Sequence, residues 1–152
     1  MFITCQKAVI FILEYLVTVN YRKRESDMKV GIASNDEHSI ANHFGRTKGF
    51  IIAELLEGEV KSKEYRLNNF THHSHQETHE HQGGHNHSHN SILSALKDCE
   101  VVISRGMGKR IYDDLREANI EEMITDIAGV DEAITAYLTG TLVDNPEKGC
   151  VH

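Results

Sequence analysis

Residues 100–118 read EVVISRGMGKRIYDDLREA, and this stretch combines a strand pattern, a glycine-rich turn and a helix pattern. The apolar run at residues 101–103 is uninterrupted, which is typical of a buried strand. Apolar residues in the helix recur at helical spacing and form one face. They are Ile111, Tyr112, Leu115 and Ala118. A buried strand followed by an amphipathic helix predicts a sheet that is covered by helices.

Similar patterns surround this unit. The predicted strands are residues 29–33, 49–56, 59–66, 100–104 and 122–125, and the predicted helices are residues 91–97, 108–118 and 130–138. Glu57-Gly58 is a turn signal that joins the second and third strands into an antiparallel hairpin. We expect Ser91 to cap the first helix and Gly140 to end the last one. The order β-β-β-α-β-α-β-α predicts an α/β protein with a ribonuclease-H-like arrangement, a mixed five-stranded sheet with helices packed against it.

The segments outside this pattern define the domain organisation. We expect one domain at residues 28–140, interrupted by a polar, low-complexity loop at residues 68–90, and an irregular tail at residues 141–152. Residues 1–27 form an N-terminal extension. It is an additional amphipathic helix, a poorly ordered segment, or a stretch upstream of a natural start at Met28. Its apolar run at residues 8–19 is too short for a membrane span, which needs about 20 residues. We therefore predict no membrane role.

The overall charge and the cysteines restrict the partners and the compartment. The formal net charge is -7 with histidine neutral, which argues against nucleic acid as a partner, because phosphate binding requires a basic face. Three scattered cysteines, Cys5, Cys99 and Cys150, are too few for a disulfide framework. The sequence therefore predicts a reducing, cytoplasmic setting. Cys99 precedes a buried strand and is expected in the core, whereas Cys150 and His152 are possible metal ligands without evident partners.

Histidine is the most unusual feature of the composition. The chain has 11 histidines, and eight of them fall within the sequence HHSHQETHEHQGGHNHSH. These are His72, His73, His75, His79, His81, His85, His87 and His89. Neutral imidazole binds Zn, Ni, Cu and Fe, so we expect this loop to bind a divalent transition metal. The same composition also fits an insert that serves no physiological ion, and the sequence leaves both interpretations open.

Two shorter motifs follow predicted strands. Residues 42–46 (NHFGR) lie in the loop after the first strand, where His43 could ligate a metal, Gly45 could admit a bulky ligand to the backbone and Arg46 could offset negative charge. Residues 105–110 (RGMGKR) join a strand to a helix, and such a turn presents backbone N–H groups to an anion. The alternatives are an ordinary surface histidine and a turn that needs glycine only for its geometry.

The sequence contains no recognisable catalytic constellation. The first strand lacks the carboxylate that a two-metal nuclease of this fold would need, and Asp36 and Glu37 lie beyond it in a loop. No order of serine, cysteine, histidine and aspartate suggests a nucleophile with its base. We therefore predict a binding protein rather than an enzyme; the competing possibility is a relict nuclease.

The motifs together resemble the dinitrogenase iron-molybdenum cofactor biosynthesis family, which includes NifX, NafY and the C-terminal domain of NifB. The resemblance covers roughly residues 28–140 and rests on four segments: Met28–Ser34 (MKVGIAS), residues 43–46 (HFGR), residues 101–103 (VVI) and residues 106–108 (GMG). Thr47-Lys48 replaces a more usual Ala-Pro-type step, Arg105 replaces a common glycine, and the histidine-rich insert is not a general family feature.

This resemblance implies a function and a site. Family members bind the iron-molybdenum cofactor or its iron-sulfur precursor cluster and carry it between assembly proteins that donate and accept it. By this likeness His43 is the expected cluster ligand, supported by Gly45 and Arg46 and by Gly106, Met107 and Gly108. The alternative is a divalent-metal chaperone or buffer for Ni, Zn or Cu that acts mainly through the histidine-rich loop.

Overall fold

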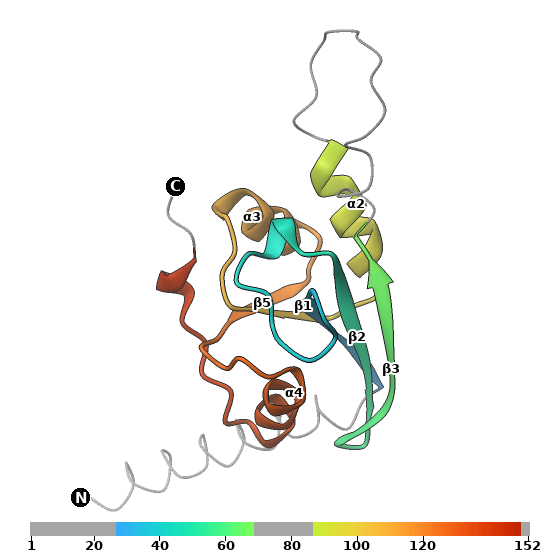
Figure 1. Ribbon diagram of the computed structural model, residues 1–152. Helices are drawn as coiled ribbons and strands as arrows, with labels where there is room; N and C mark the ends of the chain where they lie inside the picture. The colour runs from blue at the N-terminus through green and yellow to red at the C-terminus, as the bar shows by residue number, and fades with distance from the viewer. Residues whose placement is uncertain (1–26, 69–86, 150–152) are drawn as a thin grey trace, which may run out of the picture.

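The computed structural model describes residues 27–68 and 87–149, and for residues 87–90 it describes the backbone alone. The strands are β1 (Met28–Ser34), β2 (Gly49–Leu56), β3 (Glu59–Leu67), β4 (Val101–Ser104) and β5 (Glu121–Ile124). The helices are α2 (His87–Leu96), α3 (Lys109–Glu117) and α4 (Val130–Thr139), with short 3-10 turns η1 (Phe44–Arg46) and η3 (Pro146–Lys148). Figure 1 shows their arrangement.

The five strands form one mixed sheet in the order β3-β2-β1-β4-β5. β2 is antiparallel to β1 and β3, whereas β4 is parallel to β1 and β5. The predicted ribonuclease-H-like class, a mixed five-stranded sheet with packed helices, is confirmed. The hairpin at Glu57-Gly58 is also present, and both residues have the positive φ angles that a tight hairpin turn requires.

Alternating side chains divide the core into two layers. Val102 points toward α2 and α3, where it packs with Leu96 and Leu115. Its neighbours Val101 and Ile103 point to the opposite face, where α4 covers the sheet. The sheet is therefore enclosed on both faces, as Figure 1 shows, and residues that bind a ligand must lie at its edges or in its loops.

The first helix begins earlier than the sequence predicts. α2 starts at His87, so Ser91 lies inside the helix and the prediction that it caps the N-terminus is wrong. Ile92 and Leu96 are one helical turn apart and buried in the core. The apolar spacing that indicates a helix in the sequence therefore begins only at Ile92. The polar residues 87–90 add one turn beyond that apolar face.

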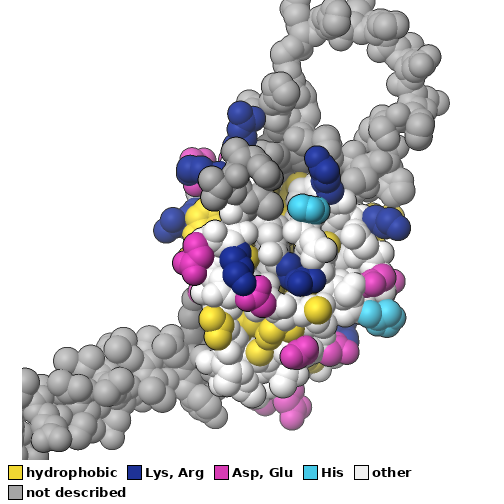
Figure 2. Space-filling view, turned by 60° about the vertical axis from the view of Figure 1, so that its left-hand side comes forward, with side chains coloured by type: hydrophobic (Ala, Val, Ile, Leu, Met, Phe, Trp, Pro, Cys, Tyr) yellow, Lys and Arg dark blue, Asp and Glu magenta, His cyan; other side chains and the backbone are white. Residues whose placement is uncertain are grey.

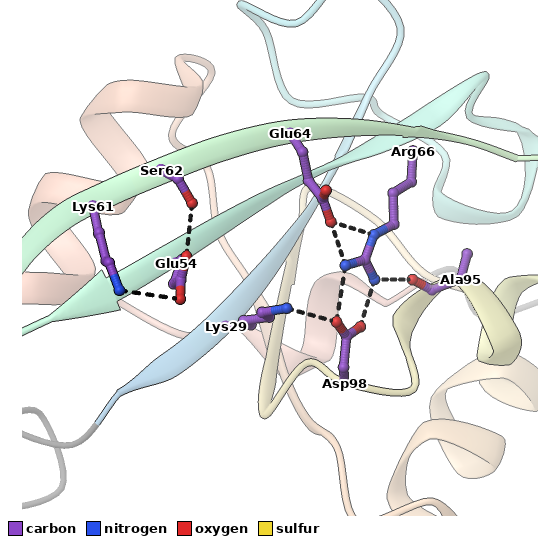
Figure 3. Close-up of polar contacts among 8 residues, drawn as sticks. All are labelled: Lys29, Glu54, Lys61, Ser62, Glu64, Arg66, Ala95 and Asp98. Atoms are coloured by element: carbon purple, nitrogen blue, oxygen red, sulfur yellow. Dashed lines mark hydrogen bonds and ion pairs between the residues drawn. The ribbon is translucent and has the colours of Figure 1, made fainter.

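An ionic cluster holds the end of α2 against the sheet (Figure 3). Arg66 of β3 donates to both carboxylate oxygens of Asp98 and, at 2.8 Å, to the carbonyl oxygen of Ala95 in α2. Lys29 Nζ also donates to Asp98, at 2.9 Å, and Glu64 pairs with Arg66. Hydrogen bonds from Arg66, followed by those from Lys29, hold the pKa of the Asp98 carboxyl well below its usual range. The cluster thus ties β1, β3 and α2 together.

The carboxyl ends of the parallel strands β1, β4 and β5 lie at one edge of the sheet. After β1 the chain turns to β2 on one side, and after β4 it passes through α3 to β5 on the other side. Ligands of α/β sheets bind where the direction of such connections reverses. In this fold the point of reversal lies between the loop at residues 35–48 and the turn at residues 105–108, which together we call the carboxyl edge.

Residues 1–26, which are all but the last residue of the predicted N-terminal extension, lie outside the described residues. Among the residues that the structure describes, no helix is both long and apolar enough to cross a membrane. Cys99 is buried, as predicted, and burial raises the pKa of its thiol to about 12.

Candidate functional site

The two predicted motifs meet at the carboxyl edge. The backbone N–H of Phe44 donates to the carbonyl oxygen of Gly106 at 3.0 Å, which joins the loop after β1 to the turn after β4. The Phe44 side chain anchors this contact, because it is buried and its ring centroid lies 5.2 Å from that of Phe50. His43 directly precedes this anchor, so its backbone is fixed beside the glycine-rich turn.

The side chains of the first motif face solvent. His43 and Arg46 are exposed on either side of buried Phe44. Gly45 is also exposed, and a β-carbon added there would meet no atom within 4 Å. The fold therefore does not require glycine at this position. The open space beside Gly45 would allow a ligand to approach the backbone of η1.

The turn at residues 105–108 presents backbone rather than side chain. Gly106 is buried, and Met107 is 2% exposed, so its side chain belongs to the core and only its backbone can contribute to a site. Gly108 is the N-cap residue of α3, so the start of this helix has no side-chain capping hydrogen bond. The first turn of α3 also contains no acidic residue. The first N–H groups of a helix have no partner within the helix, and the helix dipole favours an anion beside them.

Basic side chains surround this part of the carboxyl edge. Arg46, Lys109 and Arg110 are exposed, and Arg105 is half-buried. One of these charges is partly neutralised, because Lys109 Nζ lies 2.7 Å from Asp113 Oδ2. Figure 2 shows a histidine side chain on a face where several lysine and arginine side chains gather. In a chain with a net charge of -7, this local positive charge favours an anionic ligand.

A buried polar network that the sequence does not predict supports the loop at residues 35–48. Thr47 is fully buried, and its hydroxyl lies 3.0 Å from the carbonyl oxygens of Ser34 and Gly49, either of which can accept its proton. The buried Asn68 donates its side-chain amide to the Thr47 carbonyl oxygen at 3.0 Å and its backbone N–H to Lys48 O at 2.8 Å. The network ties the segment after His43 to the ends of β1 and β3.

Asp36, one of the two acidic residues directly after β1, has a structural role. Asp36 accepts hydrogen bonds from the backbone N–H groups of His38 and Ser39 at 3.0 and 2.7 Å and from the Ser39 hydroxyl at 2.7 Å. These bonds, led by the Ser39 hydroxyl, hold the pKa of Asp36 well below its usual range. His38 therefore lies on a separate turn, and its carbonyl oxygen accepts from Val130 N–H at 2.9 Å.

Most of the predicted histidine-rich metal ligands lie outside the described residues. These are His72, His73, His75, His79, His81 and His85. His87 and His89 lie in the first turns of α2, where only the backbone is described. Within residues 27–68 and 91–149, no three histidine, cysteine, aspartate or glutamate side chains come together in a group that could hold a metal ion.

Comparison with known proteins places this arrangement in a family. Residues 27–140 match the family described as dinitrogenase iron-molybdenum cofactor. The chain belongs to this family. The match covers the whole described sheet, both motifs of the carboxyl edge and α4.

Individual proteins also resemble the chain in sequence or in fold. An uncharacterised protein of Methanocaldococcus jannaschii is 27% identical over 108 residues, which cover 70% of this chain and 83% of that protein. The apo form of the orange protein from Desulfovibrio gigas has a TM-score of 0.59 at 16% identity, covering 80% of this chain and 95% of that one. A Methanocaldococcus jannaschii protein described as a candidate dinitrogenase has a TM-score of 0.58 at 22% identity, covering 79% and 96%. These two structures share the fold.

Proposed function

We propose that this protein binds and carries an anionic metal-sulfur cluster, the iron-molybdenum cofactor or an iron-sulfur precursor, between assembly proteins in the cytoplasm. The cluster is cargo, and the protein holds and releases it without catalysis. The observation that supports this proposal is the hydrogen bond between Phe44 N–H and Gly106 O, because it places the exposed His43 beside the amide-rich turn at the carboxyl edge.

The chemistry of this edge suits such a cargo. The His43 imidazole can ligate an exposed iron or molybdenum atom through a ring nitrogen. The N–H groups at the start of α3 and the guanidinium of Arg46 can hydrogen-bond to sulfide and offset the negative charge of the cluster. A single imidazole with several weaker contacts favours a cargo that must be released again.

We expect His43→Ala to bind the cluster at least about tenfold more weakly, since loss of even a supporting residue typically costs 10–100-fold in metal affinity. The test is anaerobic reconstitution of the full chain with ferrous iron and sulfide, followed by charge-transfer absorbance and determination of bound iron and sulfide. His43 is exposed, so its replacement should leave the thermal unfolding temperature unchanged.

His38→Ala is the matched control for this experiment. His38 is also an exposed histidine of the loop after β1, but its backbone is bonded to α4 rather than to the glycine-rich turn. It should retain the absorbance of the unmodified chain. Equal cluster content in the two variants would contradict the proposed role of His43.

A second function, a divalent-metal buffer or chaperone, is favoured by the eight histidines of residues 72–89. The chain enters this region at Asn68, whose backbone and side chain are both bonded to Thr47-Lys48, directly after the first motif. We propose that this region binds Ni, Zn or Cu independently of the cluster.

Replacing these eight histidines with asparagine should abolish the binding of more than one Ni²⁺ or Zn²⁺ per chain. Imidazole protonates near pH 6.5, so binding by the unmodified chain should also fade below about pH 6. Titration calorimetry at neutral and acidic pH measures both effects, and circular dichroism checks that the fold is retained. Unchanged stoichiometry in the replaced chain would exclude a buffer at this region.

A further inference from the structure

Most basic side chains of the described residues are compensated by a carboxylate. Lys63 Nζ lies 2.7 Å from Asp131 Oδ1, and Lys148 Nζ lies 2.6 Å from Asp126 Oδ2. The other basic side chains that form such ion pairs are Lys29, Lys61, Arg66, Lys109 and Arg116. An ion pair reduces the charge that a surface presents to an approaching molecule, so these positions attract other anions only weakly.

The carboxyl edge contains the exceptions. Among residues 27–68 and 91–149, four basic side chains in or next to this edge form no ion pair with a carboxylate. They are Arg46, Lys48, Arg105 and Arg110, which we call the basic edge patch. Elsewhere in the same ranges Lys97 is also unpaired, and it precedes β4 at the opposite edge of the sheet.

The backbone that carries the patch is held by the fold. Lys48 N–H donates to Asn35 Oδ1 at 2.8 Å, and the carbonyl oxygen of Lys48 accepts from Asn68 N–H at 2.8 Å. Arg110 lies in the first turn of α3, a regular helix. A charged side chain on a fixed backbone loses less conformational entropy when it is bound than one on a loose segment.

The patch borders the proposed cargo site on two sides. Two of its residues follow His43 in the loop after β1, and the other two lie in the turn after β4 and at the start of α3. The Phe44–Gly106 hydrogen bond joins these two segments. Figure 2 shows lysine and arginine side chains both above and below a histidine side chain on this face. A protein that approaches the cargo therefore meets the patch.

The opposite edge of the sheet carries exposed carboxylates. They include Glu100 before β4, Glu117 at the end of α3 and Glu121 at the start of β5. Because the whole chain has a net charge of -7, it repels an acidic partner from most directions and attracts it at the basic edge patch. The charge distribution thus turns the cargo site toward such a partner.

We propose that the basic edge patch is the docking surface for an acidic face of the protein that donates or accepts the cargo. This inference rests on the proposed function, because a cargo held at His43 is exchanged only with a protein that approaches this edge. A long nucleic acid or an anionic membrane fits the patch less well, since it would also face the acidic remainder of the surface.

The test uses a fluorescein-labelled decaglutamate peptide as the probe and measures its anisotropy with the full chain at low ionic strength. Lys48→Gln and Arg110→Gln should each weaken the affinity by about two- to fivefold, which is the contribution of one exposed ion pair. The double variant should bind more weakly than either single variant. Added salt should weaken binding by the unmodified chain, because it screens exposed charges.

Lys97→Gln is the matched control, because it removes the same charge from an unpaired side chain at the opposite edge. It should bind the peptide as the unmodified chain does. Equal loss in Lys97→Gln and Lys48→Gln would show that net charge, rather than the patch, governs binding, and would overturn the inference. Tighter binding of oligothymidylate or of phosphatidylserine vesicles than of the peptide would also overturn it.

A second arm separates docking from cargo binding. Lys48→Gln should take up as much iron-sulfur cluster as the unmodified chain, whereas His43→Ala should lose the cluster and still bind the peptide. Unchanged peptide affinity in Lys48→Gln and Arg110→Gln, in a chain that takes up the cluster, would refute only this inference. Peptide binding through the patch in a chain that takes up no cluster would refute the proposed cargo and retain the docking surface.

Discussion

Replacing Phe44 with alanine should lower the free energy of unfolding by about 3–5 kcal/mol, the usual cost of deleting a buried aromatic ring. Phe44 is 1% exposed, stacks in a tilted geometry on Phe50 and belongs to the core layer beneath α2 and α3. The substitution would leave a cavity beside Phe50, at the residue that directly follows His43. Urea unfolding followed by circular dichroism measures the change.

Phe44→Leu is the control, because it keeps an apolar side chain in the same space and should cost clearly less than Phe44→Ala. The alanine variant should also bind the metal-sulfur cluster poorly even where it remains folded, since the bond to Gly106 O depends on the position of this residue. A loss of less than about 1 kcal/mol in Phe44→Ala would show that the loop is not anchored by the ring.

Gly49→Ala should produce the second large loss of stability, about 1–3 kcal/mol or more. A β-carbon at this position would lie 2.5 Å from the carbonyl oxygen of Arg66 and 2.7 Å from the Tyr65 hydroxyl. The first of these atoms belongs to the backbone of the paired strand β3, so β2 and β3 would have to separate where they begin to pair. Thermal unfolding by calorimetry measures the effect.

Gly45→Ala is the matched control, because the added methyl group would meet no atom within 4 Å. It should change the free energy of unfolding by less than about 0.5 kcal/mol. Equal stability of Gly49→Ala and Gly45→Ala would show that the close approach of β2 and β3 at Gly49 can relax without cost.

Much of the fold was predictable because it follows from local patterns. The apolar run at residues 101–103 and the helical spacing of Ile111 and Leu115 identify their elements without tertiary information. The start of α2 is not predictable in this way. Its first turn, residues 87–90, contains only polar residues, so no helical spacing of apolar residues marks it in the sequence.

The site was predictable in part. His43 and Gly106 each follow a parallel strand, and such strand ends share one edge of a sheet, so their proximity follows from the topology. The roles of Thr47 and Asn68 could not be foreseen, because a buried polar side chain is stabilised by partners that are distant in the sequence. Met107 was grouped with the site residues, although its side chain packs in the core.

The anchoring of Asn68 to Thr47-Lys48, and of the end of α2 to Arg66, has a consequence for evolution. The connection between β3 and α2 starts at Asn68, which is bonded to the fold, and leads into a helix whose far end is bonded to Arg66. The entropic contribution to the free energy of loop closure becomes only about 0.6 kcal/mol less favourable for each doubling of loop length. The length and sequence of this connection can therefore change, and a histidine-rich tract can be gained or lost there, at little cost to the stability of the sheet.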